Sequence, residues 1–305
     1  MSLVRRIGLF ALTNIAVTST IIAIVHFSGL GAYLQKSGIS YGGILVMCTI
    51  WGMGGAFISL LISKFSAKMA MGVQVIDPRN ASGWQRDLLV RVQRLSEAAG
   101  LPMPEVGYYE SPEINAFATG PSRDSALVAV STGLLNRMES GEVDGVLGHE
   151  LSHVANGDMV TMTLVQGVVN SFVFFFAWIV STLIVSQLNR GDDREERGGG
   201  GFFMQYMIQQ VLVMVFGILG SIVVAYVSRA REYRADAGGA KLAGRHNMIA
   251  ALEKLNIAFS RDPVDQRGES LATLKISNRA GGLASLFATH PPLEERIAAL
   301  RAKAY

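Results

Sequence analysis

Four long apolar runs constrain this chain more than any other feature. They contain no Asp, Glu, Lys or Arg and cover residues 7–27, 41–63, 160–186 and 202–227. Each is long enough for a helix to cross the hydrocarbon core of a bilayer, which takes about 20 residues. Charged residues make up only 17% of the chain, whereas soluble domains carry about 25%. The sequence therefore predicts a multi-pass membrane protein with two transmembrane helical hairpins.

Basic residues at the ends of the first two runs predict the orientation. Arg5 and Arg6 precede the first run, and Lys64 and Lys68 follow the second. Because positive residues are retained on the cytoplasmic side, we expect the N-terminus and the protease domain in the cytoplasm. The net charge of +3 is concentrated near apolar segments, so the lipid bilayer is the expected partner and nucleic acid is not.

An H-E-x-x-H motif, His149-Glu150-Leu151-Ser152-His153, lies in a helical pattern. Two histidines four residues apart lie on one helix face and can bind one zinc ion. The glutamate beside the first histidine then serves as the general base of a metalloprotease. We expect this helix to begin at Ser140 as N-cap. Two histidines on a solvated helix are the alternative interpretation.

A third zinc ligand is expected after the second hairpin. His153 lies seven residues before the run at 160–186, and Glu232 lies five residues after the run at 202–227. At about 1.5 Å rise per residue, both would lie roughly 10 Å from the same membrane face. Glu232 then completes a His2Glu site for one Zn²⁺ per subunit, and Asp236, one turn later, accepts a hydrogen bond from a ligating histidine. The alternative is a charge pattern on a solvated helix.

The remaining patterns predict an α+β protein that is predominantly helical. A helix is expected at 84–99, short strands at 105–109 and 126–130, and an edge strand at 113–120. The predicted organisation follows the chain: an N-terminal hairpin (1–63), a first part of the protease domain with a small β-sheet (64–159), a second hairpin with a polar glycine-rich loop at 187–201 (160–227), and a second part of the protease domain (228–305).

These motifs occur in the order seen in the HtpX family, which the chain resembles over essentially its whole length. Besides the H-E-x-x-H motif and the E-x-x-x-D pair of Glu232 and Asp236, the resemblance includes Asn115-Ala116-Phe117 and the segment His290-Pro291-Pro292. HtpX proteins are bacterial heat-shock-associated membrane zinc endopeptidases, similar in their catalytic core to the CAAX prenyl proteases. The resemblance implies an inner-membrane protease for membrane-protein quality control under stress. It implies that His149, His153 and Glu232 are ligands, that Glu150 is the base, that Asp236 supports the ligands, and that Asn115 and His290 line the substrate site.

The chemistry of these residues predicts a mechanism. Glu150 takes a proton from water and passes it to the leaving amine, and His290 is the candidate donor to the oxyanion. We expect a polypeptide substrate to bind extended, adding a strand beside residues 114–117, with Asn115, Ala116 and Phe117 as substrate-binding residues and Asn115 holding the substrate's backbone. Misfolded or unassembled membrane proteins would suit such unselective binding.

Three alternatives remain open from the sequence. One is a CAAX-type prenyl-protein processing protease, and another is a zinc-binding membrane scaffold without catalysis. The third, a metal transporter, is disfavoured because the four apolar runs hold no ionisable Asp, Glu, Lys or Arg. Self-cleavage and homo-oligomerisation are both compatible with the sequence.

Overall fold

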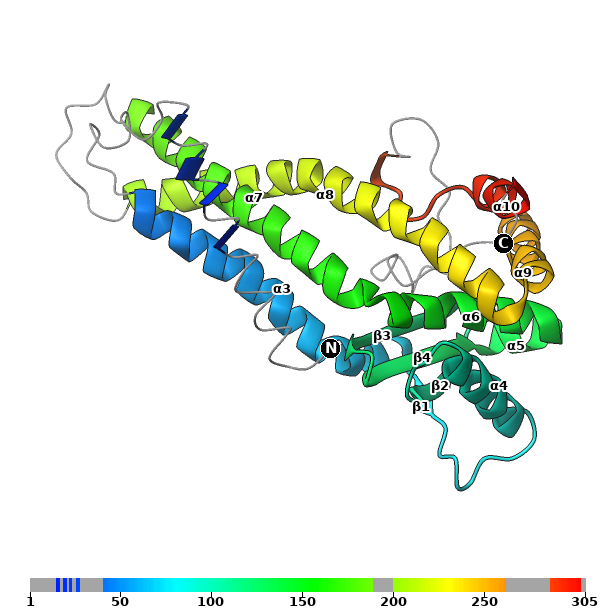
Figure 1. The fold of residues 1–305 in the computed structure, drawn as a ribbon. Coiled ribbons are helices and arrows are strands. Elements are labelled where there is room, and N and C mark those ends of the chain that lie inside the picture. The colour runs from blue at the N-terminus through cyan, green and yellow to red at the C-terminus, as the bar shows by residue number, and fades with distance from the viewer. Residues whose placement is uncertain are drawn as a thin grey trace. The chain divides into compact units, whose positions relative to one another are not determined.

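The computed structural model describes residues 15–16, 19–20, 22–23, 26–27, 41–188, 200–261 and 286–302 (Figure 1). Within these residues the fold is mostly helical with one small mixed sheet, which confirms the predicted α+β class in outline. The elements are α3 (Tyr41–Met71), β1 (Gln74–Val75), α4 (Trp84–Ala98), β2 (Glu105–Tyr109), β3 (Ala116–Ser122), β4 (Ser125–Ser131), α5 (Thr132–Arg137), α6 (Ser140–Asn156), α7 (Asp158–Leu188), α8 (Gly200–Ala243), α9 (Arg245–Arg261) and α10 (Leu293–Ala302).

Among the described residues, α3, α7 and α8 are long and apolar enough to cross a membrane. Most of the first apolar run, 7–27, and most of the predicted loop 187–201 lie outside the described residues, so the two hairpins stay a prediction. The chain divides into two compact units, one formed by Met1–Ile58 with Thr163–Val224 and the other by Ser59–Met162 with Ala225–Tyr305. The predicted domain organisation likewise stays a prediction.

In the first unit, α3 and α7 approach each other through small residues. A Cβ on Gly52 of α3 would lie 2.6 Å from the backbone nitrogen of Ser171 on α7. Beside this contact, Leu45 of α3 packs in one apolar cluster with Phe175 and Ile179 of α7. Close contact through small residues is how membrane helices gain van der Waals energy without a hydrophobic driving force.

The second unit contains the sheet, whose strand order is β1-β2-β4-β3. β2 and β4 are parallel, while β1 pairs with β2 and β3 pairs with β4 in antiparallel fashion. β3 therefore lies at one edge, as expected for the strand that contains Ala116. Its start differs by a few residues from the prediction of 113–120, and Asn115 precedes the strand directly.

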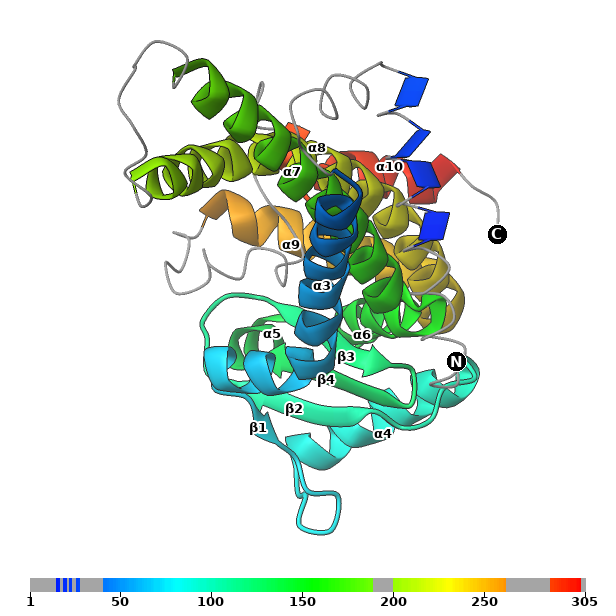
Figure 2. The same ribbon diagram turned by 90° about the vertical axis from the view of Figure 1, so that its left-hand side faces the viewer.

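Side chains alternate between the two faces of the sheet. Val128 and Val130 face a core formed with α4 and α6, whereas Leu127 and Ala129 face a second cluster that includes Ala67 of α3. Figure 2 views the strands with the last turns of α3 in front of them. The period of two along β4 thus buries the strand on both faces, between the end of α3 and the helices behind.

Helix α6, which contains the H-E-x-x-H motif, is capped at both ends. Its N-cap is Glu139, in a capping box with Glu142, so the prediction of Ser140 as N-cap is wrong by one residue. A glutamate side chain can cap because its carboxylate accepts from the first-turn N–H groups. The helix ends at Gly157, whose left-handed conformation (φ 73°) favours glycine.

Glycines allow α6 and α8 to cross at short range. A Cβ on Gly239 of α8 would lie 3.0 Å from the backbone nitrogen of His149. Gly148, the residue before that histidine, faces the Gly239 carbonyl in the same way. Since α8 runs without interruption from Gly200 to Ala243, the same helix that holds the fourth apolar run, 202–227, also carries Glu232 past the H-E-x-x-H helix.

We expect Gly239→Ala to lower the melting temperature of the purified protein by several degrees, because the added Cβ would push α8 away from α6. Alanine is otherwise the better helix former by about 1 kcal/mol. The matched control is Gly217→Ala on the same helix, where a Cβ would meet nothing within 4 Å and the melting temperature should stay equal or rise. Equal behaviour of the two variants would contradict the crossing.

Candidate active site

Three candidate metal-binding side chains, all buried, converge between α6 and α8. His149 and His153 come from α6 and Glu232 from α8. The two Nε2 atoms are 3.2 Å apart, and the Glu232 carboxylate oxygens lie 3.5 Å from His149 Nε2 and 3.3 Å from His153 Nε2. A tetrahedral zinc ion with bonds of about 2.0–2.1 Å separates its ligand atoms by about 3.3 Å. The triangle therefore has the size that zinc requires.

Each histidine is oriented by a buried carboxylate on its other nitrogen. His149 Nδ1 lies 3.0 Å from Asp236 Oδ1, and His153 Nδ1 lies 2.6 Å from Asp158 Oδ2. With Nδ1–H donating to a carboxylate, each ring presents the Nε2 lone pair to the centre of the triangle. The sequence indicated such a role for Asp236 but not for Asp158. The missed signal is an acidic residue directly after the helix-terminating Gly157.

The two carboxylate oxygens of Glu232 differ in their hydrogen bonding. Its Oε2 accepts a hydrogen bond of 2.8 Å from His290 Nδ1, while its buried Oε1 has no hydrogen-bond partner among the described residues. A buried carboxylate oxygen without a donor is costly. A cation between the three side chains would satisfy it, so the donor set fits a metal ion.

Arg296, which sequence reasoning did not identify, lies fully buried on α10 beside the triangle. Its Nη2 and Nε donate to the two oxygens of Asp236 at 2.6 and 2.8 Å, and its Nη1 lies 3.5 Å from Glu232 Oε2. The available signal was an arginine on the apolar side of a short helix, next to Ile297 and three residues after Leu293.

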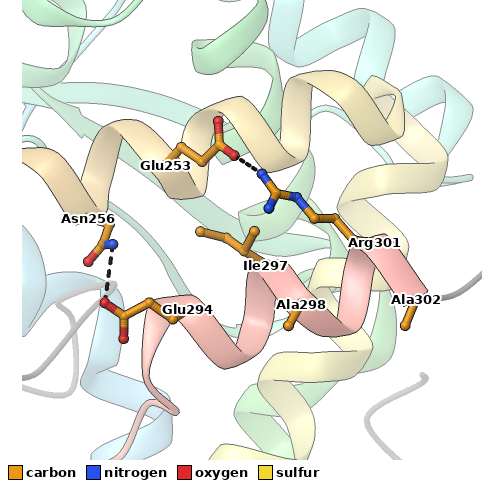
Figure 3. A pocket seen from close by; sticks show the side chains of 7 residues that line it. All are labelled: Glu253, Asn256, Glu294, Ile297, Ala298, Arg301 and Ala302. Carbon is orange, nitrogen blue, oxygen red and sulfur yellow. Dashed lines mark hydrogen bonds and ion pairs between the residues drawn. The ribbon is translucent and has the colours of Figure 1, made fainter.

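Helix α10 is held against α9, and this contact places Arg296. The ion pair of Arg301 with Glu253 and the hydrogen bond of Asn256 with Glu294 (3.4 Å) lie at the two ends of a shallow groove between the helices (Figure 3). Both interactions are exposed and contribute little individually. Their effect here is positional, because they hold the helix whose inner side carries the buried guanidinium.

The buried charges around the triangle are predominantly negative. Four carboxylates are buried there: Glu150, Asp158, Glu232 and Asp236. Among the described residues, Arg296 is the only buried Lys or Arg side chain. Buried charges require partners of opposite sign, so the imbalance favours either protonated histidines or a bound dication.

The predicted substrate-binding residues lie in different environments. Asn115 is buried, exchanges hydrogen bonds with Ser131 through its backbone, and has a side-chain Oδ1 without a hydrogen-bond partner. Ala116 and Phe117 are buried on opposite faces of the sheet. Their side chains belong to the core, so only their backbone on the edge strand is available to a ligand.

Tyr109 is a further polar group close to Asn115 and to Glu150. Burial, together with the charges of Glu113 and Glu150, raises the pKa of the Tyr109 phenol despite the opposing influence of the polar Asn115 side chain. The hydroxyl therefore stays protonated. Its ring packs against Phe117 at 5.8 Å between centroids.

The segment that carries His290 is held by an arginine of α8. Arg229, one turn before Glu232, donates from Nη1 to the carbonyl oxygens of Leu286 (3.1 Å) and Ala288 (2.8 Å). His290 is buried, and its Nε2 has no hydrogen-bond partner among the described residues. These contacts make Arg229 a tether for this segment.

Comparison with known proteins agrees with this arrangement. Residues 84–304 match the model of Peptidase family M48. The chain belongs to this family. It is 48% identical over 299 residues to a Protease HtpX homolog of Methylacidiphilum infernorum, covering 97% of this chain and 98% of that protein. It is 50% identical over 300 residues to Protease HtpX of Shewanella sp. (strain MR-4), covering 98% and 100%.

A solved structure shows the same fold as this M48 protein. The crystal structure of S. mikatae Ste24p matches with a TM-score of 0.57 at 19% identity, covering 95% of this chain and 66% of that one. The M48 match and the HtpX relatives confirm the family resemblance predicted from the motifs. The protein is a membrane-associated metallopeptidase.

We expect metal binding to release a proton near pH 7. Burial lowers the pKa of His149, but hydrogen bonds with Asp236 and Glu232 outweigh this effect and raise the pKa to about 9. The metal-free protein therefore carries a proton there at pH 7, and a metal must displace it. Titration with zinc by calorimetry in two buffers of different ionisation enthalpy should show this release.

The same pKa has a consequence for stability. Because the folded pKa of His149 exceeds the value of about 6.5 in unfolded chains, its stabilisation of the metal-free protein is complete below pH 6.5. It is lost as the pH rises to about 9. A melting temperature of the metal-free protein that rises over this interval, or zinc heats independent of buffer, would contradict the assignment.

We expect Arg296→Met to destabilise the protein by roughly 3–5 kcal/mol, because it leaves the Asp236 carboxylate buried without its cation. Chemical unfolding of the purified protein in detergent measures the loss. The control is Arg301→Met on the same helix, where the exposed ion pair contributes about 0–1 kcal/mol. Similar losses for both variants would show that α10 packing, rather than the buried charge, accounts for the effect.

Proposed function

We propose that this metallopeptidase is a zinc endopeptidase of the bacterial inner membrane that cleaves misfolded or unassembled membrane proteins on the cytoplasmic side. The observation that most directly supports this proposal is the triangle of His149, His153 and Glu232, with Glu150 on the same helix as the histidines. Nitrogen and carboxylate ligands in a set of three suit a catalytic zinc that keeps an open position.

His149 and His153 would hold the ion through Nε2, and Glu232 through its carboxylate. When bound, zinc supplies Lewis-acid polarisation of the scissile carbonyl and lowers the pKa of water towards about 7. Asp236 and Asp158 support this role, because each accepts the Nδ1 proton of one histidine. A ligand held in one tautomer and orientation loses little entropy when the ion binds.

Glu150 would act as the general base. Its carboxylate takes a proton from the attacking water and later delivers it to the nitrogen of the leaving amine. Its position beside His149 on α6 supports this, and the residue is only 6% exposed.

His290 and Asn115 would hold the substrate. The hydrogen bond between its Nδ1 and Glu232 orients the His290 ring, which would present Nε2 to the developing oxyanion. The Asn115 side chain has a buried oxygen without a hydrogen-bond partner, which suits a peptide N–H of the substrate. Both atoms are satisfied when a polypeptide is bound.

Substrate would bind by strand addition along β3, beginning beside Asn115. β3 is an edge strand that pairs with β4 on one side. Main-chain pairing gives affinity without demanding particular side chains. Buried Ala116 and Phe117 would contribute their backbone alone, which supports broad selectivity for unfolded segments.

The proposed topology places the N-terminus and the protease domain in the cytoplasm. α3 would return from an N-terminal span, and α7 and α8 would form the second hairpin. Lys64 and Lys68 at the end of α3, with Arg5 and Arg6, support this orientation by the distribution of positive charge.

We expect Glu150→Gln to bind zinc as the parent does but to cleave unfolded casein at least about 100-fold more slowly, because general base catalysis is lost. The measurement uses detergent-purified protein that is stripped of metal, assayed, and assayed again after zinc is restored. Glu97→Gln, an exposed glutamate on α4, is the matched control and should cleave at the parental rate.

Two other results would redirect the proposal. Equal cleavage by the parent and Glu150→Gln would rule out Glu150 as the base. Zinc binding without casein cleavage by the parent would favour a scaffold or a prenyl-protein processor. Cleavage of a prenylated peptide that is lost on removal of its lipid would identify the processor.

A further inference from the structure

The last turns of α3 expose an apolar stripe beyond the point where the sequence ends the span. Ile62, Phe65 and Met69 are 49%, 66% and 69% exposed and recur at three- and four-residue spacing. Residues at this spacing lie on one side of a helix. The stripe therefore continues past Lys64, which had marked the predicted end of the span at residue 63.

The two lysines in these turns point away from the stripe. Lys64 Nζ and Lys68 Nζ lie 2.6 and 2.5 Å from the two carboxylate oxygens of Glu105, at the start of β2. Lysines near a membrane boundary usually extend to the headgroup layer. Here both are paired to the sheet, so they do not mark the boundary on the outer side of the helix.

The opposite side of the same turns covers the sheet. Ala67 is buried in the cluster formed by Tyr109, Phe117, Leu127 and Ala129, with Met71 packed beside it. These turns are thus a layer one helix thick. One side contacts the strands, and the other presents Ile62, Phe65 and Met69.

We propose that this stripe is a lipid-contact surface, and that the last turns of α3 lie in the interfacial layer of the bilayer. We identify lipid as the contact because the stripe belongs to the apolar helix Gly42–Met71 of 30 residues, which is long and apolar enough to cross a membrane. At about 1.5 Å per residue this helix is about 45 Å long. That length matches the roughly 40–45 Å of a bilayer with its headgroup regions, rather than the 30 Å of its core.

This placement deepens the proposed function and rests on it for its consequence. A helix is about 10 Å in diameter, so the sheet behind α3 is held about that far from the lipid. Phe117 of β3 packs in the cluster beneath α3. An extended segment that leaves the bilayer surface can therefore reach the β3 edge without first crossing bulk water, and membrane-anchored chains become the favoured substrates.

Fluorescence quenching tests the contact. The full-length protein with Cys48, the only cysteine, replaced by Ser receives one NBD-labelled cysteine at Phe65→Cys or Met69→Cys and is placed in phosphatidylcholine and phosphatidylglycerol nanodiscs. The aqueous control is Gln93→Cys on the exposed side of α4, and the lipid control is Met47→Cys within α3, which is 55% exposed. Quenchers are lipid with a doxyl group at carbon 5 and aqueous iodide.

The proposal expects at least threefold stronger quenching by the doxyl lipid at positions 65 and 69 than at position 93, with at least threefold weaker quenching by iodide. Iodide quenching equal to that at position 93 would overturn it. Protection from both quenchers would also overturn it, because protein rather than lipid would then cover the stripe.

A second measurement tests the consequence. The double variant Phe65→Asp with Met69→Asp should cleave a membrane-anchored unfolded substrate at least fivefold more slowly while cleaving casein at the parental rate. Val90→Asp, at an exposed apolar position of α4 that is 60% exposed, is the control and should affect neither substrate. Unchanged cleavage of the anchored substrate by the double variant would overturn the consequence. Failure of the parent to cleave either substrate would count against the proposed function. The quenching experiment would still test the lipid contact, because it does not depend on cleavage.

Discussion

The close crossing of α6 and α8 is the constraint on which the site depends. At Gly148 and Gly239 the two backbones approach closely enough that a Cβ would touch the opposite helix. A glutamate side chain is shorter than that of Lys or Arg. Glu232 can therefore bring its carboxylate to both histidines only because the two helices lie this close together. Helix packing in this protein therefore sets the geometry of the candidate metal-binding triangle, and adding one methyl group at the crossing would change that geometry.

Around that crossing, several carboxylates are buried, which costs electrostatic free energy. Carboxylates orient both histidines, and a third carboxylate completes the triangle, all away from solvent. Arg296 offsets part of this charge through its two bonds to Asp236. The remaining negative charge favours a bound cation, which would make metal binding and stability interdependent. The arginine comes from α10, so this helix completes the surroundings of His149.

The histidines, the neighbouring glutamate and the ExxxD pair could be anticipated because their spacing is local. Helical periodicity alone places two side chains on one face, and the length of the second hairpin indicated that Glu232 returns near His153. Asp158 and Arg229 could not be assigned roles in this way, because their contacts depend on turns and on a segment 57 to 59 residues away. Arg296 could be noticed on an apolar helix side, but its partner could not be named from the sequence.

The sequence by itself determined the chemical class of this protein. Long apolar runs without charge indicate a membrane, and the H-E-x-x-H spacing places two metal-binding histidines on one helix face. It also determined the short strands and the order of the motifs. The tertiary structure alone decided which carboxylate faces which histidine, which residues of β3 are core, and on which side of α3 the lysines lie. These depend on the crossing of helices and on the pairing of strands, whose contacts join residues far apart in the chain and leave no periodic trace within it.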